Sequence, residues 1–288
     1  MSRPLRAAGV RAAAAVKAVV AWEALPAAVA AASSAAAGGV GAADARASHA
    51  PALPAVAAAA AAADAIPSPA TRPHPELYTG APPVRDEAAG VWRFADAPSF
   101  TPSLSPEAIL RAGAFGGGYF RPIYCSVTHR TYREAWREFP AAWFAGMDVK
   151  KFVASPVYRA SVNRFGVACG QSLEAWQTSG WITAWDSFGW FHWYCRFTLG
   201  RRCEDDARQI SRWLACCGPT GRWKGNLAAK VLAARAAYDD ARVAPVVRQT
   251  LLHWAYELTE RDLAAAAAKA KKTGVISGAY VPALPFLG

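Results

Sequence analysis

The residues best suited to chemistry gather between 189 and 206, in the sequence GWFHWYCRFTLGRRCEDD. His192 and Cys195 are three residues apart, so on a helix they would share a face, and with Cys203 they could supply three zinc ligands. His192 and Cys195 could also form a base and its nucleophile. The sequence offers neither a fourth metal ligand at short spacing nor an evident oxyanion hole. We therefore expect no catalytic residue and no metal site in this stretch.

Arg201 and Arg202 lie in the same stretch, and neighbouring guanidinium groups suit bidentate contacts with phosphate or carboxylate. A structural alternative is equally simple. Positive charge after Gly200 would stabilise the end of one helix, and the acidic residues 204–206 would stabilise the start of the next. The aromatic side chains of the preceding segment repeat at helical spacing, as is typical of a helix packed in a core: Trp190, Trp193, Tyr194 and Phe197.

Two glycine-containing segments offer further places for an anion. AFGGGYFRPIY, residues 114–124, has three consecutive glycines before Arg121, and GPTGRWKG, residues 218–225, is rich in positive charge. Neither matches a nucleotide-binding motif. The first could instead let an aromatic side chain approach the backbone, and the second is typical of a turn and a helix start. We name as candidate anion-binding residues Arg121, Arg201, Arg202, Arg222 and Lys224, and as a candidate pocket Gly116, Gly117, Gly118 and His192.

The elements that must position these residues are mostly short helices. Serine before a first-turn proline or acid and glycine after the last turn repeat along the chain, and these are helix start and stop signals. We expect helices at 105–113, 128–140, 155–166, 171–180, 186–200, 203–218, 222–241, 244–259 and 259–272. YFRPIY and GWITAW are the candidates for short strands. Nine of the 12 tryptophans lie between 136 and 223. The sequence therefore predicts an all-α, or nearly all-α, compact Trp-rich multi-helix domain.

Several of these segments together resemble an uncharacterised family of small Trp-rich proteins found in algae, fungi and plants. The resemblance covers roughly residues 115–258 and rests on NRFGVACGQSLEAW, WFHWYCRFTLGRRCEDDARQISRW, GPTGRWKGNL and PVVRQTLLHWAYELT. It implies no assigned activity, cofactor or partner.

The remainder of the chain sets the domain boundaries. Residues 1–89 are dominated by alanine with scattered proline, glycine and serine, which favours a disordered leader and linker. We place a single helical domain at 90–275 and a tail at 276–288. The first 22 residues carry four basic side chains before the first acid, a pattern typical of a mitochondrial or plastid transit peptide and also of a low-complexity alanine leader. The apolar stretch around residues 18–32 contains Glu23 and Pro26 and is mostly alanine, so we expect no membrane span. Six cysteines without a CxxC pair favour free thiols in an intracellular, reducing compartment.

The charge of the protein bears on its partner. The chain of 288 residues has a formal net charge of +11, and residues 101–230 carry 17 basic and 9 acidic side chains. An excess of positive charge favours anionic partners. Our leading hypothesis is a non-enzymatic binding module for nucleic acid backbone or another polyanion. Two alternatives stay open: an enzyme acting on a small anionic metabolite through the candidate pocket, and an organellar assembly factor that binds a protein partner. We expect no cofactor.

Overall fold

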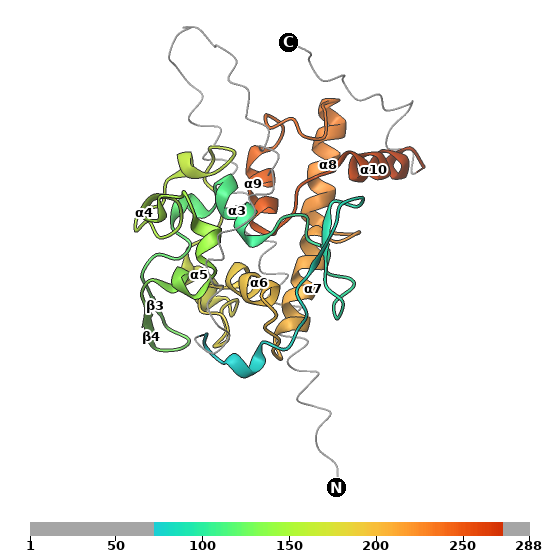
Figure 1. Cartoon of the computed structure of the whole chain (residues 1–288). Helices are drawn as coiled ribbons and strands as arrows, with labels where there is room; N and C mark the ends of the chain where they lie inside the picture. The colour runs from blue at the N-terminus through green and yellow to red at the C-terminus, as the bar shows by residue number, and fades with distance from the viewer. Residues whose placement is uncertain (1–71, 273–288) are drawn as a thin grey trace, which may run out of the picture. The chain divides into compact units, whose positions relative to one another are not determined.

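A computed structural model of the protein describes residues 72–272, which are mostly helical and contain two small antiparallel hairpins (Figure 1). The predicted leader up to residue 71, its possible targeting role and the predicted tail 276–288 lie outside the described residues. The α-helices are α3 (Pro106–Ala112), α4 (Val149–Phe152), α5 (Leu173–Thr178), α6 (Trp190–Thr198), α7 (Asp206–Cys217), α8 (Arg222–Ala234), α9 (Pro245–His253) and α10 (Glu260–Lys272). The strands are β1 (Val84–Asp86), β2 (Val91–Arg93), β3 (Ile123–Cys125) and β4 (Arg130–Tyr132). Short 3₁₀ turns lie at η2 (Pro75–Leu77), η3 (Phe115–Gly117), η4 (Ala135–Glu138), η5 (Ala141–Phe144) and η6 (Ala160–Val162).

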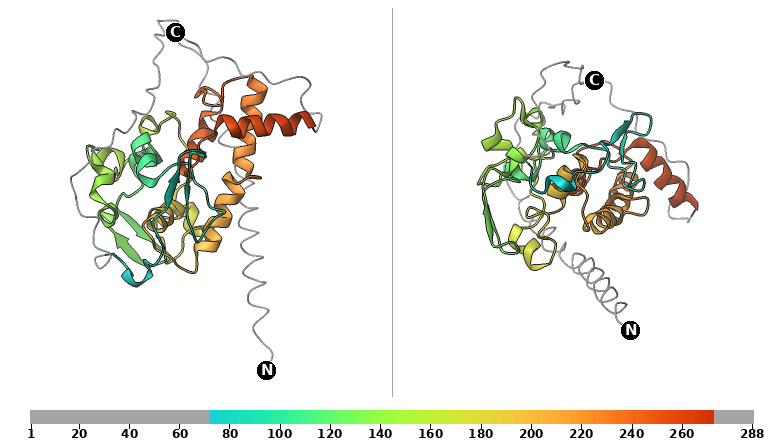
Figure 2. Two further views of the ribbon diagram at one scale, coloured as in Figure 1. Left: turned by 45° about the vertical axis from the view of Figure 1, so that its right-hand side comes forward. Right: turned by 60° about the horizontal axis from the view of Figure 1, so that its bottom comes forward.

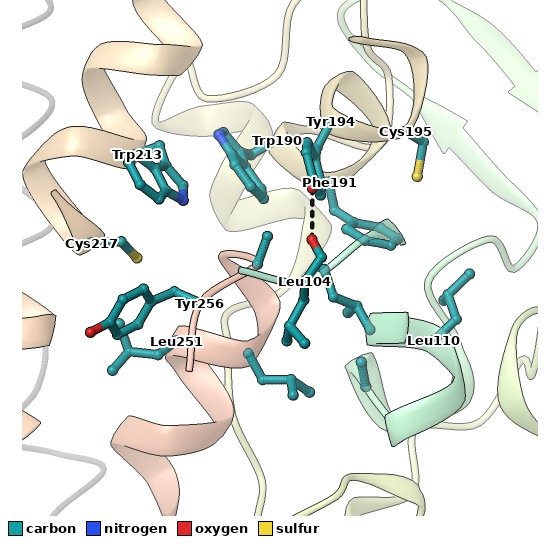
Figure 3. Packing of buried hydrophobic residues seen from close by; sticks show 14 of the residues in the cluster. Leu104, Leu110, Trp190, Phe191, Tyr194, Cys195, Trp213, Cys217, Leu251 and Tyr256 are labelled. Atoms are coloured by element: carbon teal, nitrogen blue, oxygen red, sulfur yellow. Dashed lines mark hydrogen bonds between the residues drawn. The ribbon is translucent and has the colours of Figure 1, made fainter. Parts of the chain in front are cut away.

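Helix α6 lies in the core, as its aromatic spacing predicts. Every residue from Trp190 to Phe197 is buried. The ring of Phe100, fully buried, contacts the rings of Trp190, Trp193, Tyr194, Phe197 and Trp213 at centroid distances of 5.1–6.4 Å. The Tyr194 hydroxyl donates a hydrogen bond of 2.7 Å to the carbonyl of Leu104, so the only polar atom of that side chain is satisfied (Figure 3).

Helices α7 and α8 follow one another on one side of α6, and both α9 and α10 pack against α8 (Figure 2). The helices at 105–113, 171–180, 186–200, 203–218, 222–241, 244–259 and 259–272 are confirmed, most of them shorter than predicted. Two of the serine signals act as expected: Ser105 and Ser172 accept hydrogen bonds of 3.1 Å from the backbone amides of Ala108 and Ala175. No helix within residues 72–272 has the length and apolar character that crossing a membrane requires.

The predicted helix at 128–140 is wrong. Its first part forms β4, which pairs antiparallel with β3, and its second part forms only η4. His129 and Glu134 adopt left-handed backbone conformations, with φ of 54° and 51°, which end any continuous helix here. The candidate strand YFRPIY is confirmed in its last part as β3, whereas GWITAW forms no strand.

The predicted helix at 155–166 is also wrong, since only η6 forms there. Its backbone amides bond instead to the glycine segment: Ser155 to the carbonyl of Gly117 and Arg159 to that of Gly116, at 2.9 and 3.0 Å. A Cβ on Gly117 would lie 2.0 Å from the carbonyl oxygen of Lys151. The glycines therefore let two chain segments approach closely, and this tertiary contact replaces the local helix.

Residues before 90, assigned to the linker from sequence, already belong to the packed structure. The amide of Gly80 donates to the carbonyl of Gly200 at 2.9 Å, and the amide of Arg202 donates to the carbonyl of Leu77 at 2.8 Å. A Cβ on Gly80 would overlap the Arg202 guanidinium. The segment 72–80 is thus a strap across the end of α6.

Candidate ligand pocket and the buried arginines

Two arginines near the end of α6 belong to a buried group of charges, which we call the charge cluster: Glu138, Asp186, Arg196 and Arg201. Arg201 makes a bidentate contact with Asp186, at 3.0 and 2.6 Å. Arg196 makes another with Glu138, at 2.6 and 2.7 Å, and reaches Asp186 at 3.2 Å. The four side chains are at most 11% exposed. Two positive and two negative charges are thereby balanced inside the protein.

His192 lies beside the charge cluster. Its Nε2 is 3.7 Å from Glu138 and its Nδ1 is 3.9 Å from Asp186, and neither nitrogen makes a hydrogen bond. Burial lowers the pKa of His192, and the nearby charge of Arg196 lowers it further. Burial alone would raise the pKa of Glu138, but its two hydrogen bonds from the positively charged Arg196 outweigh this and hold the pKa well below its ordinary value. The ring of His192 is therefore a neutral member of the core.

Three other predicted anion-binding residues, Arg202, Arg222 and Lys224, also have partners. Arg202 bonds to both carboxylate oxygens of Asp96, at 2.6 and 3.1 Å, and lies 3.8 Å from the ring centroid of Phe197. Lys224 makes a salt bridge with Asp262. Arg222 begins α8, where its guanidinium lies 5.9 Å from the ring centroid of Trp223. Three of the five candidates thus already contact carboxylates of this chain.

The fifth candidate, Arg121, lines a pocket with a volume of about 390 Å³. The pocket lies between the segment following α3, the loop that precedes α5, and the end of α9. Its apolar lining includes Phe115, Ile123, Leu173, Trp176 and Phe188. Its polar lining includes Arg121, Cys169, Gln171 and His253. A concave, largely apolar space with a few polar groups is the usual form of a small-molecule site.

Arg121 differs from the arginines of the charge cluster in its surroundings. It is partly buried, and its Nη1 donates a hydrogen bond of 3.0 Å to the carbonyl of Gly118. Among residues 72–272, no carboxylate lies within 4.0 Å of its guanidinium. Burial lowers the pKa of Arg121. The pocket therefore contains a positive charge that this part of the chain does not balance.

The glycine run supports the pocket wall but is not a phosphate cradle. All three glycines are buried, and Gly118 lines the pocket, whereas Gly116 and Gly117 are not among its lining residues. All three amides already have acceptors within the chain: the Asn163 side chain at 2.8 Å and the carbonyls of Ala114 and Phe115 at 3.0 and 3.1 Å. The ring of Tyr158 covers Gly116. This agrees with the alternative that the glycines let an aromatic side chain approach the backbone. No amide of the run is left to bind an anion.

Hydrogen bonds fix the protonation of His253 at the base of the pocket. The backbone amide of Phe165 donates to Gln249 Oε1 at 3.1 Å, so the Gln249 amide nitrogen faces His253 Nε2 at 3.0 Å. The amide of Phe115 donates to the same Nε2, also at 3.0 Å. Because two donors face Nε2, the proton of the neutral ring lies on Nδ1. Burial lowers the pKa of His253 to about 3.

Cys169 faces that Nδ1 proton across 3.8 Å, and its Sγ also lies 3.1 Å from Thr250 Oγ1. Burial raises the pKa of the Cys169 thiol to about 11. A nucleophilic pair needs a histidine that accepts the thiol proton. His253 already has a proton on the nitrogen that faces Cys169, so the two residues lack this arrangement.

The structure brings together only part of the predicted pocket. Gly118 and Arg121 line it, whereas His192 lies at the charge cluster and is not among the lining residues. Cys169 and His253 were not predicted from the sequence, because they are 84 residues apart and only the fold brings them together. The one local signal was the spacing of Gln249 and His253, which are four residues apart on α9 and so share a face of that helix. Within the described residues, no group of three or more histidine, cysteine or acidic side chains is arranged to hold a metal ion.

Comparisons with protein-family models, with curated proteins and with solved structures find no match for this chain. The resemblance to a Trp-rich family therefore stays a prediction, and the candidate function rests on the geometry of the pocket alone.

Proposed function

We propose that this protein binds a small anionic molecule in the pocket beside Arg121. The observation that carries the proposal is the guanidinium of Arg121, which lines the pocket and meets a backbone carbonyl but no carboxylate within residues 72–272. A partly buried cation without a counterion loses solvation and gains little in return, so an anion entering the pocket would be favoured.

The state of the neighbouring groups supports binding rather than covalent chemistry. The Cys169 thiol has a pKa of about 11, and the imidazole of His253 is held neutral with its proton toward that thiol. Neither side chain offers a base near neutral pH. The proposed role is therefore that of a binding protein, and the enzyme alternative would need a reacting group from elsewhere.

Nucleic acid backbone stays an untested alternative, supported by the formal net charge of +11. The contacts of Arg201, Arg202 and Lys224 with carboxylates weaken the case for those side chains as phosphate ligands. Titration of labelled oligonucleotides at two salt concentrations separates the two functions. Tight, salt-sensitive binding would favour the nucleic acid hypothesis, because contacts with phosphates release counterions. The protein-partner alternative also stays a prediction.

The direct test is calorimetric titration of the full chain with a panel of small carboxylates, sulfonates and phosphate esters. We expect at least one anion to bind with a dissociation constant below 1 mM, on the order of 4 kcal/mol or more of binding free energy. The variant Arg121→Gln should lose this binding. The variant Arg133→Gln, which removes the same charge from an exposed position, should retain it. Binding that survives Arg121→Gln would refute the proposal.

A further inference from the structure

The charge of the pocket limits the head group of its ligand. Among the lining residues Arg121 is the only basic side chain apart from His253, which is neutral, and no acidic side chain lines the pocket. One positive charge matches one negative charge. A phosphate monoester carries about −1.5 to −2 at neutral pH, and it would leave part of its charge unpaired beside apolar walls.

The donors that Arg121 still has available suit a planar head group. Its Nη1 bonds to Gly118, whereas Nε and Nη2 make no hydrogen bond within the described residues and are not sealed from solvent. These two nitrogens form one edge of the guanidinium, with parallel N–H groups. That edge matches the two oxygens of a carboxylate.

The neutral polar side chains of the pocket fall into two kinds. The hydroxyl of Ser155 donates to the carbonyl of Val157 and accepts from Arg159, so it is occupied. The Ser172 oxygen accepts from the amide of Ala175 and caps α5, while its O–H has no acceptor within residues 72–272. The amide of Gln171 and the indole N–H of Trp176 make no hydrogen bond within residues 72–272. They add neutral hydrogen-bonding capacity and no second charge.

The walls determine the body of the ligand. Phe115, Ile123, Leu173, Trp176 and Phe188 line the pocket and are all apolar or aromatic. The volume of about 390 Å³ is near the lower end of the range for small-molecule pockets, about 300–1,000 Å³. Flat aromatic side chains favour a flat or apolar body of limited size.

We propose that the ligand is a small monocarboxylate with an aromatic or other apolar body, whose carboxylate pairs with the open edge of Arg121. This inference rests on the proposed function, since it names the class of anion that the same pocket takes. The carboxylate lies at Arg121, and the body lies against Trp176 and Phe188.

The test uses probes that share one body and differ in the head group: 3-phenylpropanoate, 3-phenylpropan-1-ol and 3-phenylpropyl phosphate. Acetate and inorganic phosphate supply each head without a body. Each is titrated calorimetrically into the full chain. We expect 3-phenylpropanoate to bind at least tenfold more tightly than the alcohol and the phosphate ester, and acetate to bind at least tenfold more weakly than 3-phenylpropanoate.

Variants then place the carboxylate. Arg121→Gln should weaken binding of 3-phenylpropanoate by tenfold or more and leave that of the alcohol unchanged. Arg121→Lys, which keeps the charge but loses the parallel donors, should give an intermediate loss. Arg133→Gln is the control for charge alone. The head-group series on the unaltered protein decides the class of ligand even if the Arg121 variants do not fold.

The outcomes separate the two proposals. If the phosphate ester binds most tightly and needs Arg121, the carboxylate class is overturned and the proposed function stands. If the alcohol binds as tightly as the carboxylate, the pocket takes neutral apolar molecules and both proposals fail. If no anion in these probes or in the wider panel binds, the proposed function itself is overturned.

Discussion

The charge cluster and the pocket both contain partly or fully buried arginines, yet they treat the charge differently. In the cluster, Arg196 and Arg201 each meet carboxylates in bidentate geometry, and the four side chains are almost inaccessible. In the pocket, Arg121 meets one carbonyl and faces an open space. A buried charge must be paired to be tolerated, so the paired arginines are part of the framework. Arg121 has no carboxylate partner and lines the pocket, where an anionic ligand would supply the negative charge.

The largest effect should come from removing a carboxylate of the charge cluster. Asp186→Asn leaves the guanidinium of Arg201 buried without its counterion, while the shape of the side chain is retained. Breaking one partner of a buried ion pair costs about 3–5 kcal/mol of unfolding free energy. Chemical denaturation by urea, followed by circular dichroism, measures this loss.

The matched control is Glu107→Gln, which removes a carboxylate from an i,i+4 pair with Arg111 on the surface of α3. Such exposed pairs contribute at most ~0.5 kcal/mol. If Asp186→Asn proved as mild as Glu107→Gln, the charge cluster would not be a structural element, and the contrast with Arg121 would disappear.

A smaller effect is expected from acidification, through the imidazole of His253. Its pKa is about 3 in the folded protein against an ordinary value of 6.5, so below pH 6.5 the unfolded state binds a proton that the folded state does not. This depressed pKa contributes stability that is fully present above pH 6.5 and is lost as the pH falls toward 3. Between pH 7 and pH 5 the loss is about 2 kcal/mol.

The measurement is the free energy of unfolding at several pH values between 7 and 5. His253→Gln should remove about 2 kcal/mol of the decrease over this interval, whereas His129→Gln, at an exposed histidine, should leave the decrease unchanged. The part that remains in His253→Gln should include His192, whose pKa is also lowered by burial. An unchanged pH dependence in His253→Gln would show that this ring is accessible to protons.

Local features of the fold were predictable from the sequence, whereas contacts between distant residues were not. Helix caps such as Ser105 and the aromatic spacing of α6 act within a few residues, so they were visible without a structure. The partners of the arginines were not, because Glu138 and Arg196 are 58 residues apart and only the fold brings them together. The helix predictions for 128–140 and 155–166 were wrong for the same reason. Pairing of the first segment with β3, and of the second with the glycine segment, outweighed a weak local preference for helix.

A more modest effect is expected at the wall of the pocket, which depends on the hydroxyl of Tyr158. This hydroxyl accepts hydrogen bonds from Asn163 and from the amide of Cys169, both 2.9 Å, and donates to the carbonyl of Cys169 at 3.2 Å. Tyr158→Phe should cost about 1 kcal/mol and loosen residues 167–171. Hydrogen exchange followed by mass spectrometry should show faster exchange there, while the charge cluster is unaffected.

The control for that variant is Tyr124→Phe on the β3–β4 hairpin, where the hydroxyl has a single contact of 3.5 Å with His129. Exchange in 167–171 should be unchanged in Tyr124→Phe. Faster exchange in both variants would mean that the wall is not held by Tyr158 in particular.

The smallest effect on stability should come from Arg121 itself. Arg121→Met removes one hydrogen bond to Gly118 but also the cost of a poorly solvated charge, so the unfolding free energy should change by less than about 1 kcal/mol in either direction. Arg201→Met, the same substitution in the charge cluster, leaves Asp186 unpaired and should cost about 3–5 kcal/mol. Urea denaturation of both variants gives the difference. Equal losses would place Arg121 in the framework, and the pocket would then have no cation reserved for a ligand.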